Sequence, residues 1–404
     1  MLRSNRSLRR LLAAWLQSCL GTGAGYVALL LLTRDYLHSP WAISGVLLAD
    51  FLPAIALGSW FGALADRHSR RVLIVAANVI QAAAWGGLAL VHTAVPIFAL
   101  ALLAGFGNGL ERPAMRSALP ILAEANGQVA AAVYDTCRWL GITLGPLVAA
   151  ALFAVSGSGL ALALNGLSFL VSGLVMLTVQ IDAPPRPQTH EQKAASTLRA
   201  GLAVAFSAPG IAAVIACSVG AIVAGGLLNV CEPLLAINVL HGSGSDYALL
   251  VACYGVGMVT ASVLVARRGA VAARVLIRRY LDAQILTATG MFGSAIVGSV
   301  GPATLAFAAT GYGNALLLVS AAQLIQLRVP TAVQGRLFGA KDTIEGAALM
   351  AGLLGAGGLI AGEGVRVTLA TGAGICGLCA LGAIMTVRTG APGPKPAAGA
   401  QPML

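Results

Sequence analysis

The chain has 404 residues, of which 58% are hydrophobic and only 10% are charged, and its mean hydropathy is +0.86. A soluble globular domain carries about 25% charged residues, so this composition excludes an ordinary soluble protein. The formal net charge of +11 does not indicate nucleic-acid binding, because nearly all basic residues lie in short segments between long apolar runs.

The apolar runs predict an all-α membrane protein with twelve transmembrane helices, since about 20 apolar residues suffice to cross a bilayer. The first half (1–181) and the second half (207–387) contain six runs each, with a proline-containing, charged linker (182–206) between them and a tail (388–404) after them. The fourth span is short, and we expect it to continue past Glu111. The predicted spans are 11–32, 42–64, 72–93, 95–110, 129–154, 158–179, 207–231, 246–266, 278–298, 302–326, 344–362 and 367–387.

The distribution of Lys and Arg predicts the orientation of these spans. With the N-terminus inside, the inner segments carry 22 of the 25 basic residues, whereas the outer loops carry only Arg34 and Arg366, and Arg138 lies within a span. This asymmetry predicts that both termini are cytoplasmic. No cleavable signal peptide is expected, because the basic start leads directly into a full-length span.

The loop between the second and third spans has the sequence GALADRHSRR, from Gly62 to Arg71. It resembles the G-x-x-x-D-R-x-x-R-R signature of the major facilitator superfamily, a family of membrane transporters. Ser69 stands where that family usually has Gly, whereas the other signature positions match: Gly62, Asp66, Arg67, Arg70 and Arg71. The resemblance implies two pseudo-symmetric six-helix bundles, with this loop on the cytoplasmic side and substrate bound between the bundles.

An internal repeat indicates a duplication. The tetrapeptide ending at Asn108 (GFGN) matches the one ending at Asn314 (GYGN), and Asp135–Arg138 matches Asp342–Glu345 more loosely; the offsets are 206 and 207 residues. Both pairs fall in equivalent spans, so the two halves are expected to share one fold.

The fifth span carries small residues and a proline at Gly141, Gly145 and Pro146. This segment is similar to the antiporter motif of the superfamily, which is typical of exporters, although Ala149 and Ala150 replace its last two glycines. Small residues one turn apart let helices approach closely, and proline bends a helix. A generic packing face is the alternative. Segments after the fourth and tenth spans resemble loops of the siderophore and macrolide exporter branch.

Ionisable residues within spans need a reason, since each costs about 3 kcal/mol or more at a helix centre. Asp50 in the second span, Glu232 in the seventh and Asp135 in the fifth are our candidates for proton coupling. The alternatives are pairing with a residue on another helix, a position near water, and for Asp135 a local ion pair with Arg138. Glu111 and its neighbour Arg112 are interpreted as residues that reach the cytoplasmic interface.

Four amide side chains lie on the spans that line the cavity in the resembled fold, and they could bind substrate or simply join helices: Gln17, Asn108, Asn229 and Asn314. A second set of residues is expected to form a cytoplasmic latch. Asp66, Arg70 and Arg71 would contact Asp342 and Glu345, while Arg267 and Arg268 would contact Asp135, in the closed state only. Alternatively, the arginines only fix the topology.

Together these patterns predict a secondary active transporter that exports a small amphipathic compound, such as a drug, antibiotic or siderophore-like molecule, in exchange for protons. A lipid facilitator or uptake permease of the same fold is the alternative, and a membrane enzyme or sensor is a remote one. No catalytic cluster, nucleotide-binding loop or metal-ligand spacing is present in the sequence. We therefore expect no enzyme activity, no cofactor and no nucleic-acid partner, and a monomer in the cell membrane.

Overall fold

The computed structural model of the protein describes residues 5–123, 127–181, 203, 210–268 and 272–389. All regular structure in these ranges is helical, with twelve α-helices and one short π-helix. Most of the predicted linker (182–206) and most of the predicted tail (388–404) lie outside the described residues. The helices are α1 (Arg6–Leu37), α2 (Pro40–Ala56), α3 (Gly58–Arg67), α4 (Arg70–Leu88), α5 (Ala94–Ala123), α6 (Gly127–Leu177), α9 (Ile211–Leu234), η2 (Leu235–Val239), α10 (Gly244–Arg268), α11 (Ala273–Ile296), α12 (Val300–Arg328), α13 (Thr331–Glu363) and α14 (Val365–Thr389).

By length and composition, nine helices within the described residues could cross a membrane, or ten if the bent pair α2–α3 is one span. Two further spans complete the predicted twelve. The 51-residue helix α6 contains a reversal and so supplies two spans, and α11 is long enough to cross a membrane although it begins with charged residues.

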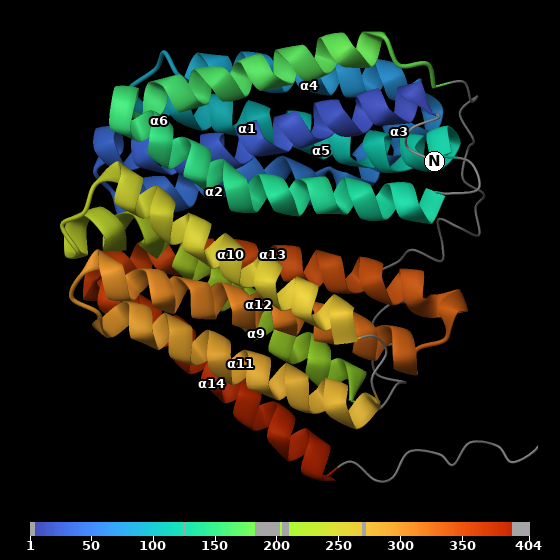
Figure 1. Cartoon of the computed structure of the whole chain (residues 1–404). Coiled ribbons are helices and arrows are strands. Elements are labelled where there is room, and N and C mark those ends of the chain that lie inside the picture. The colour runs from blue at the N-terminus through green and yellow to red at the C-terminus, as the bar shows by residue number, and fades with distance from the viewer. Residues whose placement is uncertain (1–4, 124–126, 182–202, 204–209, 269–271, 390–404) are drawn as a thin grey trace, which may run out of the picture.

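Gly157 divides α6. Its φ of 71° and ψ of −166° are not helical, and a residue with a side chain rarely adopts such a positive φ. The chain reverses there, so the two parts of α6 run in opposite directions, with α1 between them (Figure 1). The break falls between the predicted spans 129–154 and 158–179.

The predicted span 42–64 is bent rather than straight. It consists of α2 and α3, which meet at Leu57 with an angle of 52°. Pro53 lies one turn before the bend and has no N–H to donate to the preceding turn, and Gly58 follows directly after Leu57. The sequence predicted the extent of this span well, but it did not indicate the bend.

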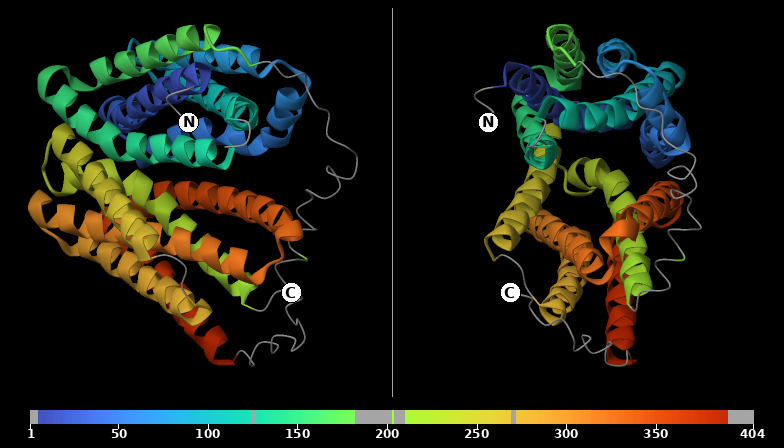
Figure 2. Two further views of the ribbon diagram at one scale, coloured as in Figure 1. Left: turned by 45° about the vertical axis from the view of Figure 1, so that its right-hand side comes forward. Right: turned by 90° about the vertical axis from the view of Figure 1, so that its right-hand side faces the viewer.

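The helices form two groups (Figures 1 and 2). Helices α1 to α6 make one half and α9 to α14 the other, with their axes running in roughly the same direction. We name the two ends of this bundle by the chain. The terminal end contains the start of α1, the α3–α4 junction and the end of α14. The distal end contains the α1–α2 junction, Gly157 and the α13–α14 junction.

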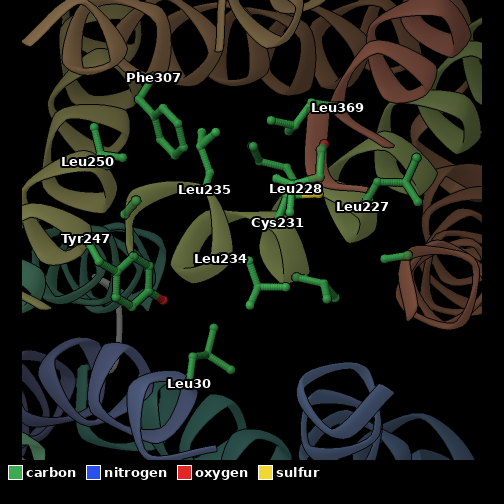
Figure 3. Close-up of a cluster of buried hydrophobic side chains, with 14 of the residues drawn as sticks. Leu30, Leu227, Leu228, Cys231, Leu234, Leu235, Tyr247, Leu250, Phe307 and Leu369 are labelled. Carbon is green, nitrogen blue, oxygen red and sulfur yellow. Dashed lines mark hydrogen bonds between the residues drawn. The ribbon is translucent and has the colours of Figure 1, made fainter. Parts of the chain in front are cut away.

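At the distal end the two halves are packed together by one apolar cluster. Figure 3 shows Leu30 of α1 pointing from the first half toward Leu234 and Tyr247 of the second. A polar contact reinforces this junction, because Arg34 donates to Oδ1 of Asn238 from Nε at 3.1 Å and from Nη2 at 2.6 Å. The distal end is therefore the closed end of the interface between the halves.

The predicted duplication is visible in the packing of both halves. At Gly105, a Cβ atom would overlap the backbone carbonyl of Asp50, and at Gly311 it would overlap that of Tyr254. Two residues further on, Gly107 packs against Gln81 and Ala77, and Gly313 packs against Thr287 and Ala283. In each of these three pairs of equivalent residues, the two members lie 206 positions apart in the sequence. The same glycines therefore permit the same helix contacts in each half.

Candidate functional site

A cavity of about 290 Å³ lies between the two halves. Helices α1, α2, α4, α5 and α6 supply most of its wall, and α9 and α10 of the second half supply the rest. Its wall contains many aromatic rings, among them a parallel stack of Trp15 on Tyr134 with 4.5 Å between ring centroids. Its polar members come from both halves: Ser18, Thr22, Asp50, Gln81, Asn108, Glu111, Arg112, Arg138, Asn229 and Glu232.

Asp50 lines this cavity from the middle of α2, where its residue is 9% exposed. Its position is fixed by the close contact of its backbone with Gly105 on α5, which no other residue type would permit. It forms no ion pair with any residue in the described part of the chain. Its role in proton coupling stays a prediction.

Glu232 and Asn229 line the cavity from α9, and Glu232 is buried. Glu232 precedes Pro233 and the π-helix η2, so the helix changes its geometry directly beside this carboxylate. Like Asp50, Glu232 makes no ion pair within the described ranges. The cavity thus contains an unpaired carboxylate from each half.

The remaining predicted amides lie in different settings. Asn108 lines the cavity, where its Oδ1 accepts from Nε of Arg112 at 3.1 Å. Asn314 does not line the cavity, but its amide donates to the hydroxyl of Tyr254, which does. Gln17 is turned toward α6 and accepts from Oγ of Ser172 at 3.3 Å.

Asp135 lies outside the cavity, with an exposed side chain whose Oδ1 is 3.9 Å from Nη2 of Arg116. The alternative of a local ion pair with Arg138 is therefore wrong, since the ion pair of Asp135 within the described residues is with Arg116. Arg138 instead lines the cavity. The i, i+3 spacing favours contact between Asp135 and Arg138 on one helix, but Asp135 instead pairs with Arg116 of α5.

Glu111 is the main residue whose position the sequence pattern misjudged. It is 4% exposed and lines the cavity, rather than reaching the interface. Its Oε1 accepts from Asn78 at 3.1 Å and its Oε2 accepts from Gln81 at 2.7 Å. Helix α5 continues through Pro113 to Ala123, so Glu111 lies well inside the helix. The expected continuation of the fourth span past Glu111 is therefore confirmed, whereas the expected position of Glu111 at the interface is wrong.

The small residues of the fifth span have the packing role that the spacing predicted. A Cβ atom on Gly145 would be 2.6 Å from Cα of Gly23, and one on Gly141 would be 2.5 Å from backbone and side-chain atoms of Cys19. Helices α1 and α6 are therefore in backbone contact along this stretch. Pro146, one residue after Gly145, lines the cavity.

The signature loop joins α3 to α4 at the terminal end. Arg70 is buried, and Arg71 donates to the backbone carbonyl of Leu177 at the end of α6. The loop therefore fastens α4 to α6 within the first half. Gly62, Asp66 and Arg67 lie in α3, and a Cβ atom on Gly62 would have nothing within 4 Å.

The predicted latch acids are found beside other arginines. Asp342 and Glu345 of α13 line a pocket of about 460 Å³ at the terminal end together with Arg112, Arg116 and Arg138 of the first half. Glu345 is meanwhile bound by Lys341, with Nζ 2.7 Å from Oε2. Arg267 is exposed at the end of α10, and the side chain of Arg268 lies outside the described residues.

Comparisons with known proteins agree with this geometry. The sequence profile of the family described as "Transmembrane secretion effector" matches residues 3–396. The chain is 27% identical over 393 residues to the uncharacterized MFS-type transporter YfiS of Bacillus subtilis, covering 92% of this chain and 90% of YfiS. It is 25% identical over 326 residues to the putative bacilysin exporter BacE of Bacillus amyloliquefaciens (80% of this chain, 81% of BacE).

Two further similarities complete the comparison. The macrolide efflux protein A of Enterococcus faecalis is 23% identical over 237 residues, covering 57% of this chain and 73% of that protein. The crystal structure of the POT family transporter PepTSo matches with a TM-score of 0.72 at 12% identity, over 95% of this chain and 98% of PepTSo, and so shares its fold. The chain belongs to the transmembrane secretion effector family of major facilitator transporters, and it is a multi-pass membrane transporter rather than an enzyme.

Proposed function

We propose that the protein is a secondary active exporter that expels a small amphipathic compound in exchange for protons. The observation that carries this proposal is the composition of the cavity: aromatic walls together with unpaired, buried carboxylates from both halves, Asp50 and Glu232. Similarity to a macrolide efflux protein and a putative bacilysin exporter supports the export direction and a drug- or antibiotic-like substrate.

The two components of the wall would bind different parts of the substrate. Faces of Trp15, Trp85 and Tyr254 would take its apolar body, since aromatic rings bury large apolar areas and also attract cations. A buried carboxylate without a partner is costly, and it can be neutralised either by a proton or by a cationic group of the substrate. Competition between the two for Asp50 or Glu232 would couple proton entry to substrate release.

Alternation between two open states would require a gate at the terminal end, which the predicted orientation puts in the cytoplasm. The charges around the terminal pocket support such a gate, because Arg112, Arg116 and Arg138 of the first half face Asp342 and Glu345 of the second. This set of arginines takes the place of Arg70 and Arg71 as our proposed partners for the two acids. We further propose that the protein acts as a monomer in the cell membrane.

The test is transport into inside-out vesicles from cells that lack their own efflux pumps, with radiolabelled erythromycin and ethidium as probes. A proton-coupled exporter should accumulate a probe when the vesicle interior is acidic and should lose this accumulation when a protonophore is added. Accumulation that survives the protonophore would favour a facilitator. Uptake into intact cells that exceeds that of vector controls would favour a permease.

A further inference from the structure

Glu111 is a buried ionisable group that the proposed cycle above does not use. Both of its oxygens accept hydrogen bonds from neutral amides of α4, namely Asn78 and Gln81. It forms no ion pair with any residue of the described chain. Burial of a carboxylate at this depth costs free energy, and a purely structural hydrogen bond between neutral groups would cost less. The presence of an acid here therefore favours a functional role.

The second half of the protein shows that the fold does not need an acid here. The contacts of Gly107 and Gly313 fix the relation between the halves at 206 residues, so position 317 corresponds to 111 and position 284 to 78. These are Leu317, which is 1% exposed, and Gln284, which donates to the backbone carbonyl of Cys217. The same helix packing is therefore achieved with an apolar residue in place of Glu111.

The amide groups around Glu111 can serve both of its protonation states. The ionised carboxylate accepts from two N–H donors, as observed. The protonated form must donate its O–H instead, and an acceptor is at hand because Oδ1 of Asn78 is buried and has no hydrogen-bond partner. A rotation of the Asn78 amide would exchange its nitrogen and oxygen and bring Oδ1 toward Glu111, since the two orientations of an amide have nearly the same shape.

Several charged or titratable groups face this carboxylate from the elements packed around it. Arg112 on α5 itself, Cys19 on α1 and Tyr134 on α6 lie within electrostatic range of Glu111. Cys137 and Arg138 of α6 lie near Cys19, Arg138 and Asp50 line the same cavity, and α4 contributes the neutral amides Asn78 and Gln81. Arg112 lies within electrostatic range of both Glu111 and Asp50. Arg112 is therefore a cation that the two acids share.

The cavity adjoins a second pocket on its terminal side. Arg112, Tyr134 and Arg138 line the cavity and also the pocket of about 460 Å³ at the terminal end. The distal end is closed by the apolar cluster and by the contact of Arg34 with Asn238. Within the described residues, the neighbouring pocket therefore lies on the terminal side of the cavity and the packed apolar cluster lies on its distal side.

We propose that Glu111 is a proton-binding residue of the transport cycle, held in its ionised form by Asn78 and Gln81 and electrostatically linked to Asp50 through Arg112. In the distally open state, a hydronium ion in the cavity transfers a proton to Oε1 of Glu111 and becomes water, and the Asn78 amide rotates so that its Oδ1 accepts a hydrogen bond from the new O–H. In the terminally open state, the O–H bond breaks, the proton returns to water at the terminal end, and the two amides again donate to the carboxylate. This inference rests on the proposed proton coupling.

The first test follows the carboxyl group itself and needs no substrate. The full-length protein in liposomes is titrated while infrared difference spectra record the C=O stretch of protonated carboxylic acids. We expect a band that titrates in the wild type and is absent in Glu111→Gln. The same substitution at Glu363, an exposed acid at the end of α13, is the matched control and should leave that band in place. An unchanged band in Glu111→Gln would overturn the inference.

A second variant guards against loss of folding in the first. Gln81→Leu removes the donor at 2.7 Å, so the ionised form loses a hydrogen bond and the band should persist to higher pH than in the wild type. A band that titrates as in the wild type would contradict the role given to Gln81 and Asn78. Thermal unfolding of each variant shows whether it is folded.

Vesicle transport separates this inference from the proposed function. If wild-type transport of erythromycin or ethidium depends on the pH gradient and Glu111→Gln transport does not, both stand. If both proteins show the same dependence on the gradient, only the role of Glu111 fails. If the wild type itself shows no dependence on the gradient, the proposed proton coupling fails, and the role of Glu111 in it falls as well.

Discussion

Arg138 of α6 and Glu345 of α13 occupy equivalent positions in the two halves, 207 residues apart, and both line the pocket at the terminal end. In a protein built from two parallel repeats, equivalent positions near the pseudo-twofold axis face each other across it. At this place the repeats carry opposite charges. Oε1 of Glu345 is also buried without a hydrogen-bond partner, while its Oε2 is bound by Lys341. Glu345 thus has one oxygen available for a second cation.

Reversing the charge of Arg138 should therefore impair closure of the terminal end. We expect Arg138→Glu to slow turnover and to increase labelling, from the terminal side, of a single cysteine placed at Ile142 on the cavity wall. The double variant Arg138→Glu with Glu345→Arg should recover most of both. A coupling of about 1–3 kcal/mol corresponds to about 5–150-fold in the conformational equilibrium. If the double variant is no better than Arg138→Glu alone, the two residues do not interact in the closed state.

Substitutions at Gly145 should test the backbone contact between α1 and α6. In Gly145→Ala, the new Cβ would lie 2.6 Å from Cα of Gly23, so the helices must separate. Overpacking of this kind destabilises by about 1–3 kcal/mol, and we expect a lower unfolding temperature for the purified protein.

The matched control for this substitution is Gly225→Ala on α9, where a Cβ would meet nothing within 4 Å. There the gain in helix propensity should raise stability by about 0.5–1 kcal/mol. Equal unfolding temperatures for the two variants would show that the α1–α6 contact is more tolerant than its geometry indicates.

The helices themselves were largely predictable from the sequence, because long apolar runs have few other solutions in a bilayer. The predicted span 302–326 became Val300–Arg328, and 246–266 became Gly244–Arg268. The predicted span 344–362 was too short, since α13 begins at Thr331. Charged residues near Lys341 suggested a loop, but a helix can continue past the apolar layer and carry its charges there.

The site was predictable to the level of helices but not of helix faces. Asp50, Glu232, Asn108 and Asn229 line the cavity as expected. Asn314 does not line the cavity but donates to Tyr254, which does, because packing with neighbouring helices decides which side of a helix faces the cavity. The arginines that we propose as gate partners of Asp342 and Glu345 also depend on which side of a helix faces the interface, and the latch predicted from the sequence stays a prediction. A local ion pair of Arg138 with Asp135 was one alternative from the sequence, and only the fold places Arg138 in the same pocket as Glu345.

The orientation of the protein can be tested by labelling intact cells. Ser243 lies exposed at the distal end, before α10, and Ser69 lies exposed at the terminal end, in the signature loop. A cysteine at Ser243, in a chain without native cysteines, should react with a membrane-impermeant maleimide added outside. A cysteine at Ser69 should react only after the membrane is permeabilised. The reverse pattern would contradict the orientation predicted from the 22 inner basic residues.

Asp50 provides the most direct test of proton coupling. Asp50→Asn keeps the size of the side chain and its capacity for hydrogen bonds but removes the group that can gain and lose a proton. The variant should fold and enter the membrane, because the close contact at Gly105 involves only the backbone of residue 50. We expect it to lose accumulation of erythromycin or ethidium against a gradient while it still exchanges the probe across vesicles without one.

The pH dependence of Asp50→Asn gives this prediction its sharpest form. The rate of wild-type export should depend on pH on the side from which protons enter, because an ionised Asp50 must be neutralised before the cycle continues. In the variant the residue is neutral at every pH, so this dependence should flatten. Glu232→Gln is the partner experiment, since Glu232 is the unpaired acid of the other half. Full proton-driven accumulation by Asp50→Asn, together with loss in Glu232→Gln, would transfer the coupling role from α2 to α9.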